Sequence, residues 1–272
     1  MSTPETPSAP ASPDSPIVEG GLRLANLTVA RGGRDVVHDI TIDVAPGEVT
    51  ALLGPNGAGK SSMVLAVGGV LPLTAGTVTL AGEQLAGKRP ERIRRAGLAI
   101  VPEGRRLLGE LTVEDNLKIA TYTLSAKAGA AARTHALELF PELEKRLHNQ
   151  ARALSGGEQQ MVVLAQALVS QPKFIIIDEL SLGLAPVVVQ RLIPTIDTVT
   201  HNGIGVLLIE QFAAVALDLA NRAYVIEGGH IQYSGTAHQL KTTPELLHSA
   251  YLLRGDTTTP TTTPNESLPT TG

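Results

Sequence analysis

The sequence has 272 residues, of which 43% are hydrophobic, and a formal net charge of −4 at pH 7. This length is sufficient for one large domain with a buried core. The 22 Lys and Arg residues against 26 Asp and Glu disfavour nucleic acid as a partner, because domains that bind it usually carry excess positive charge. The absence of cysteine excludes disulfides and zinc–thiolate sites.

Both ends of the sequence differ from its middle. Residues 1–20 have Pro at positions 4, 7, 10, 13 and 16, and residues 255–272 are rich in Thr and Pro. Such segments favour extended conformations and cannot build a core, so we expect two disordered tails around a folded domain at residues 21–254. The longest nearly apolar stretch is shorter than the about 20 residues that span a bilayer, and no signal-peptide pattern precedes the domain. We therefore expect a soluble, intracellular protein.

The predicted elements alternate between strands and helices along the domain. Alternation of apolar and polar residues predicts strands at 22–29 and 40–44, and a more continuous apolar strand is expected at 47–53. A short strand at 77–80 follows a helix at 63–70. Residues 88–157 are rich in Ala, Leu, Glu and Arg, which predicts a helical subdomain that includes one helix at about 130–147.

The second half of the domain predicts a parallel sheet. A helix is expected at 158–169, and unbroken apolar runs at 174–177 and 205–209 are typical of strands buried on both faces. Strand–helix–strand order with a helical insertion indicates an α/β core with a separate helical subdomain.

Residues 54–61 match the phosphate-binding pattern G-x-x-x-x-G-K-[ST] completely, between an apolar strand and a helix. The glycines let backbone N–H groups point at one anion, and the following helix adds its positive end. Lys60 supplies a charge for the β- and γ-phosphates, and the Ser61 hydroxyl can ligate Mg²⁺. This segment, the P-loop, therefore predicts ATP and Mg²⁺ as ligands. Its candidate nucleotide-binding residues, with the next serine, are Gly54, Pro55, Asn56, Gly57, Ala58, Gly59, Lys60, Ser61 and Ser62.

Two acids follow the apolar strand at 174–177. Asp178 at the end of a parallel strand can reach a metal beside the phosphates, and Glu179 can polarise a water for in-line attack. Acids at strand ends are common, so the pair gains its meaning from its position about 120 residues after a P-loop.

A third motif lies at residues 154–160. Ser155, Gly156 and Gly157 precede a predicted helix and can form a second anion-binding nest. The plainer interpretation is a helix cap, with Ser155 as N-cap and Glu158 as its capping-box partner.

The three motifs, in this order, resemble the ATP-binding subunit of an ABC transporter. Further segments are similar to the branched-chain amino acid importer group, and within it to the second of its two ATPase subunits (the LivF type). These segments are residues 101–106, 111–117, 137–141, 181–186 and 208–211. The resemblance implies a P-loop NTPase (RecA-like) core with an antiparallel β subdomain and an α-helical ABC subdomain.

The resemblance also implies a shared active site. Two such subunits would hold two ATP molecules head to tail, each between one P-loop and the opposite subunit's residues 154–160, here called the signature segment. Ser155, Gly156 and Gly157 would then bind the partner's ATP, while Asp178 would help to hold this subunit's Mg²⁺ and Glu179 would act as general base. A second ATP-binding subunit (a heterodimer, or a homodimer in isolation), two transmembrane permeases and, indirectly, an extracytoplasmic substrate-binding protein are the implied partners. The expected place is the cytoplasmic face of the plasma membrane.

Three positions depart from the general family pattern. Glu103 stands where a Gln usually reaches Mg²⁺ and the attacking water, and Gln211 stands where a His is usual. Arg31 takes the place of an aromatic residue that stacks on adenine; a guanidinium can also stack, or it can be a solvated loop residue. Glu103 and Gln211 together suggest that the ATP site on this P-loop is slower than the one on its partner.

Alternatives to a branched-chain amino acid importer stay open from the sequence. Importers of urea, short amides or other amino acids use similar subunits, and soluble ABC ATPases act in translation, DNA repair or cluster assembly. Those in translation or repair usually have two ATPase domains or long coiled coils, neither of which is predicted here. A basic cluster at Arg89, Arg92, Arg94 and Arg95 could touch a permease or phospholipid, although a solvated helix face is the commoner explanation.

Overall fold

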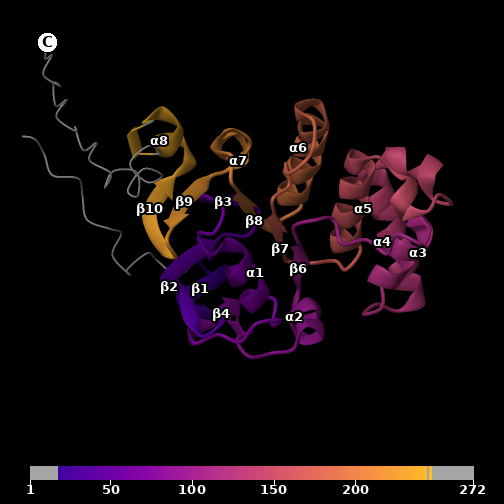
Figure 1. Cartoon of the computed structure of the whole chain (residues 1–272). Helices are drawn as coiled ribbons and strands as arrows, with labels where there is room; N and C mark the ends of the chain where they lie inside the picture. The colour runs from indigo at the N-terminus through magenta and orange to yellow at the C-terminus, as the bar shows by residue number, and fades with distance from the viewer. Residues whose placement is uncertain (1–17, 244, 247–272) are drawn as a thin grey trace, which may run out of the picture.

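The computed structural model describes residues 18–243 and 245–246. The predicted tails at 1–20 and 255–272 lie outside this range, apart from residues 18–20. Figure 1 shows two β-sheets beside a group of helices formed by α3, α4 and α5. Among the described residues, none of the helices has the length and apolar character needed to cross a membrane.

A six-stranded sheet forms the centre of the molecule, in the order β10-β9-β3-β8-β7-β6. Strands β9, β3, β8, β7 and β6 are parallel to one another, and β10 pairs antiparallel with β9 at one edge. Every residue of β3, β7 and β8 is buried, as their unbroken apolar sequences predict. The strands are β3 (Val49–Leu53), β6 (Leu98–Val101), β7 (Phe174–Asp178), β8 (Gly205–Glu210), β9 (Arg222–Glu227) and β10 (His230–Thr236).

A four-stranded antiparallel sheet, in the order β2-β1-β4-β5, packs near the first one. Buried residues alternate along β1 at 22 and 24 and again at 27 and 29, with a shift of register between the two pairs, so the period-two pattern of the sequence is confirmed on either side of that irregularity. Helix α1 lies between the sheets, because Met63 and Val67 share one core with residues of both. The elements are β1 (Leu22–Arg31), β2 (Arg34–Val44), β4 (Ala75–Leu80), β5 (Glu83–Gln84) and α1 (Lys60–Val67).

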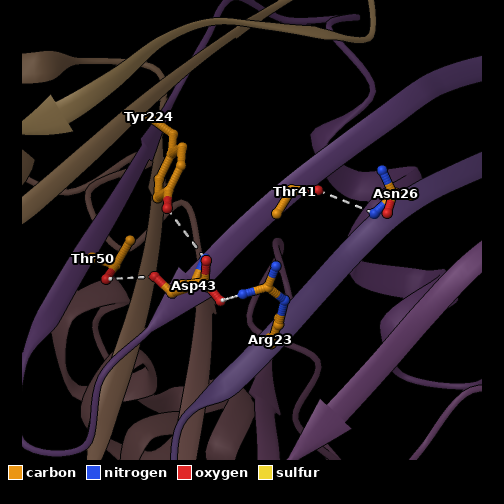
Figure 2. A network of polar contacts seen from close by, with 6 residues as sticks. All are labelled: Arg23, Asn26, Thr41, Asp43, Thr50 and Tyr224. Atoms are coloured by element: carbon orange, nitrogen blue, oxygen red, sulfur yellow. Dashed lines mark hydrogen bonds and ion pairs between the residues drawn. The ribbon is translucent and has the colours of Figure 1, made fainter. Parts of the chain in front are cut away.

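A polar network joins the two sheets (Figure 2). Asp43 on β2 is 3% exposed and accepts a hydrogen bond from Arg23 Nη1 at 3.2 Å. Its backbone N–H donates to the Tyr224 hydroxyl of β9 at 3.2 Å, and the Thr50 hydroxyl of β3 donates to its carbonyl at 3.5 Å. Burial raises the pKa of Asp43, and Arg23 and Arg222 oppose that rise. The network therefore fixes β2 against the middle of the central sheet.

The helical group contains α3 (Val113–Ala120), α4 (Ala126–Leu139), the 3₁₀ turns η1 (Pro141–Arg146) and η2 (Ala151–Ala153), and α5 (Gly156–Leu168). The prediction of one helix over 130–147 is wrong, since the chain leaves the helix at Phe140, whose φ is −133°. Pro141 is the reason, because the residue before a proline disfavours the helical conformation. Phe140 instead fills the core between the helices.

The helical subdomain, predicted at about 88–157, begins later in the chain than expected. Within that range, α2 (Pro90–Ala96) leads into β6, which pairs with β7 in the central sheet. The apolar run of β6 has only four residues and is surrounded by helix-favouring sequence, so the sequence pattern alone does not predict a strand there. The remaining helices are α6 (Pro186–His201), α7 (Ala213–Leu219) and α8 (Ala237–Thr242).

Candidate nucleotide-binding site

The predicted site residues meet at one edge of the central sheet. The P-loop follows β3, Asp178 ends β7 with Glu179 directly after it, and Gln211 follows β8. Glu103 comes two residues after β6. Since β3, β8, β7 and β6 are parallel neighbours, their carboxyl ends lie side by side, which is where open α/β sheets bind ligands.

Two glycines shape the end of the P-loop. Gly57 and Gly59 have φ of 83° and 99°, which only glycine adopts readily. A Cβ on Gly59 would lie 2.5 Å from the Val36 carbonyl of β2, so the loop passes directly against the antiparallel sheet. Lys60 then begins α1. The backbone thus directs N–H groups at a helix start, where they can bind phosphate.

Lys60 is buried beneath the loop and is surrounded by carboxylates. Its ammonium donates to the carbonyls of Gly54 at 2.7 Å and Pro55 at 3.1 Å, and it lies 3.9 Å from Glu179 Oε1. Burial lowers the pKa of Lys60, while the neighbouring acids raise it; these are Glu179, Asp178, Glu210 and Glu103. Lys60 therefore faces four acids, and this local excess of negative charge favours the binding of a further cation.

Asp178 is the best candidate for holding that cation. Its side chain is buried, and Oδ1 has no hydrogen-bond partner among the described residues. Burial, followed by the charges of Glu179 and Glu103, raises its pKa to about 6. Ser61, Glu103 and Asp178 line one groove. These oxygens fit Mg²⁺, which keeps several waters and binds through one or two carboxylates plus phosphate oxygens.

Glu210, which the sequence analysis missed, organises the loop after Glu179. It is 1% exposed and accepts two hydrogen bonds from Ser181, from the backbone N–H at 3.0 Å and from the hydroxyl at 2.8 Å. Burial raises the pKa of Glu210, and the two bonds from Ser181 lower it. Glu179 itself has a φ of 56°, and its N–H donates to the Ile209 carbonyl at 2.9 Å. The loop is thus attached to the end of β8.

The signature segment lies apart from the P-loop, at the start of α5. Ser155 Oγ accepts from the Glu158 N–H at 3.3 Å, and Glu158 Oε2 accepts from the Ser155 N–H at 2.8 Å. The plainer interpretation, a capping box, is therefore confirmed. It does not exclude anion binding, because the Ser155 hydroxyl proton remains a donor. Among the residues that the structure describes, no hydrogen bond joins Ser155, Gly156 or Gly157 to the P-loop of the same chain.

The three positions that depart from the family pattern differ in their exposure and in whether they line the groove. Glu103 is exposed and lines the groove beside Ser61 and Asp178. Gln211 is partly buried directly after Glu210. Arg31 is exposed at the end of β1, and its role at adenine stays a prediction.

A groove of about 460 Å³ opens beside the site, between α1, α2 and β6. Its lining includes Glu103 and Asp178 as well as the exposed side chains of Val70 and Tyr122. Arg94 also lines it and donates to the carbonyls of Ala120 at 3.2 Å and Gln166 at 3.0 Å, near the carboxyl ends of α3 and α5. A solvated helix face is therefore the wrong description for Arg94, which joins α2 to the helical group.

Comparison with known proteins decides the family. The family model described as "ABC transporter" matches residues 37–181, which contain the P-loop, the signature segment, Asp178 and Glu179. The chain belongs to the ABC transporter family. It is 40% identical over 221 residues to the high-affinity branched-chain amino acid transport ATP-binding protein BraG of Pseudomonas aeruginosa, covering 81% of this chain and 94% of that protein.

Other members of the ABC transporter family agree with this assignment. The probable branched-chain amino acid transport ATP-binding protein LivF of Archaeoglobus fulgidus is 32% identical, over 80% of this chain and 93% of that protein. Among solved structures, an ATP-binding subunit of an ABC transporter is 30% identical, with a TM-score of 0.74 over 85% of this chain and 98% of the other. The predicted P-loop NTPase fold, with its antiparallel sheet and helical part, is confirmed.

Proposed function

We propose that this chain is the ATP-hydrolysing subunit that energises an ABC importer of branched-chain amino acids. The proposal rests on one observation: the P-loop, Asp178 and Glu179 lie together at one edge of the sheet. The chain that carries them matches 94% of the length of BraG. The chain would act at the cytoplasmic face of the membrane, bound to permease subunits.

The residues of the site would have separate roles in phosphoryl transfer. Lys60 would leave its loop carbonyls to bind the β- and γ-phosphates, held by the backbone N–H groups of the P-loop. Asp178 and Ser61 would hold Mg²⁺, which when bound would offset phosphate charge. Glu179, at the end of its strand, would orient the attacking water and accept its proton. Gln211 can donate to a phosphate oxygen but carries no charge.

A second ATP-binding subunit would complete each site. The signature segment is separate from its own P-loop, although its backbone and the Ser155 hydroxyl are able to bind a phosphate. In the proposed dimer it contacts the ATP of the other subunit, so the isolated chain should hydrolyse ATP poorly. A partner of different sequence is proposed, as in importers with two distinct ATPase subunits.

The groove beside the site is the proposed docking place for a permease. Exposed apolar side chains at Val70 and Tyr122 favour contact with another protein, and Glu103 and Asp178 line the same groove. A permease segment bound there would touch the ATP site itself. Movement of α3 and α5, which Arg94 joins to α2, would then reach the permease directly.

Uptake measurements test the substrate. In a strain that lacks redundant importers, deletion of this chain should abolish uptake of labelled leucine, isoleucine and valine, and restoring the chain should recover it. Restoring Glu179→Gln in its place should recover only part of the uptake. Unchanged uptake of all three amino acids would contradict the assignment, and loss of urea uptake instead would favour the short-amide alternative.

A further inference from the structure

The loop at residues 181–184, directly after Glu179, is held from two sides. Ser181 is bonded to Glu210, as described above. On the other side, Arg105 Nη2 donates to the carbonyl of Leu182 at 2.7 Å and to that of Gly183 at 3.2 Å. Arg105 comes from the segment after β6, two residues beyond Glu103, so a residue remote in sequence fixes this loop.

The same guanidinium also rests against the signature segment. A Cβ on Gly156, the first residue of α5, would lie only 2.8 Å from Arg105 Nη1. A Cβ on Gly183 would lie 3.2 Å from Nη2. One planar side chain therefore fills the space between the start of α5 and the 181–184 loop.

The backbone of Arg105 supports a positional role. Its φ is 45°, in the left-handed region that is unfavourable for residues with a Cβ. Such a conformation persists where surrounding contacts hold it, and it is concentrated at functional sites. Here the bonds to Leu182 and Gly183 supply those contacts.

We propose that Arg105 is a positioning residue that links the signature segment to the 181–184 loop, which follows Glu179. This rests on the proposed function, in which the signature segment contacts ATP bound to the other subunit. A shift of Gly156 on binding that ATP would move the guanidinium, and with it Leu182 and Gly183. Through Ser181 and Glu210 the shift reaches Glu179 and Gln211, so the two ATP sites become coupled within one chain.

Hydrogen exchange of the full chain without nucleotide tests the link directly. Arg105→Gly removes the guanidinium while tolerating the left-handed backbone, so the turn itself is preserved. Faster exchange is expected at the amides of 182–185 and 156–159. Arg105→Lys should be intermediate, because an ammonium can still donate to the two carbonyls but has no second nitrogen to fill the space beside Gly156. Arg191→Ala, at an exposed position of α6, is the matched control and should leave both segments unchanged. Unchanged exchange in Arg105→Gly would overturn the link.

Turnover in the assembled transporter tests the positioning role. For Arg105→Gly, kcat should fall about tenfold while KM for ATP stays within about twofold, as for an interaction that matters only in the transition state. Arg105→Lys should recover part of kcat. An unchanged kcat, or a rise in KM alone, would overturn the role. If the wild-type complex hydrolyses no ATP, the proposed function fails, whereas the exchange experiment still decides whether Arg105 links the two segments.

Discussion

The ammonium of Lys60 lies 3.9 Å from Glu179 Oε1, and both side chains are less than 10% exposed. The cation of the P-loop and the expected general base are therefore neighbours. In a poorly solvated place, such charges act on each other more strongly than they would in water.

This proximity predicts opposite effects on ATP binding for two substitutions. Lys60→Ala removes the charge that attracts phosphate and leaves Asp178 and Glu179 facing it, so the Kd for ATP should rise at least about tenfold. Glu179→Gln removes a repelling charge, so ATP should bind as tightly as to the wild type, or more tightly. Equilibrium binding to the isolated chain measures both. Equal weakening of ATP binding by the two substitutions would contradict the prediction that Lys60 attracts the phosphates and Glu179 repels them.

The pKa of Asp178 predicts how Mg²⁺ binding depends on pH. Its value of about 6 lies above the ordinary 3.8, so the folded chain holds a proton that the unfolded chain has lost. The contribution of Asp178 to the free energy of unfolding therefore decreases as the pH rises from 3.8 to about 6. Mg²⁺ needs the ionised carboxylate, so the Mg²⁺-dependent part of nucleotide affinity should increase from about pH 5.5 to about pH 7.5.

Calorimetric titration of ADP with and without Mg²⁺ measures this dependence. Asp178→Asn is the control, because an amide cannot titrate; its Mg²⁺-dependent increment should be small and nearly constant with pH. A wild-type increment that is flat across the interval would contradict the raised pKa.

The crowding at Gly59 predicts a difference between two similar glycines. Gly57 and Gly59 both have positive φ, so replacement by Ala should cost about 1–2 kcal/mol of unfolding free energy at either position. Only Gly59 would also push its Cβ to 2.5 Å from the Val36 carbonyl, which should add roughly 1–3 kcal/mol. Denaturant unfolding of the two variants decides the point, and equal losses would argue against the close contact with β2.

The Ser181–Glu210 pair predicts a loss of stability. Ser181→Ala leaves one oxygen of a buried carboxylate without its donor, which should cost about 1.5–3 kcal/mol. The matched control is Ser234→Ala on β10, where we expect a change within about 0.5 kcal/mol. Thermal and denaturant unfolding of both variants provide the comparison. A negligible effect of Ser181→Ala would show that the Ser181–Glu210 hydrogen bond does not stabilise the fold.

The sequence predicted the elements whose signals are local. The P-loop, the buried strands ending at Asp178 and Glu210, and the cap at Ser155 each follow from neighbouring residues. The short strand β6 and the break at Phe140 were missed, since pairing with β7 and the proline effect outweigh the surrounding helix propensity. Contacts that join distant segments, such as Arg105 to Leu182, have no local pattern and required the structure.

Gln211 and Glu103 predict that the two ATP sites of the assembled transporter are unequal. If the site on this P-loop is the slower one, Glu179→Gln in the assembled transporter should leave measurable ATP turnover, carried by the other subunit's P-loop. The equivalent substitution in that subunit should reduce turnover far more. Gln211→His should raise turnover at this site, because an imidazole can carry charge and exchange a proton where an amide cannot. Complete loss of turnover with Glu179→Gln alone would show instead that both sites are needed equally.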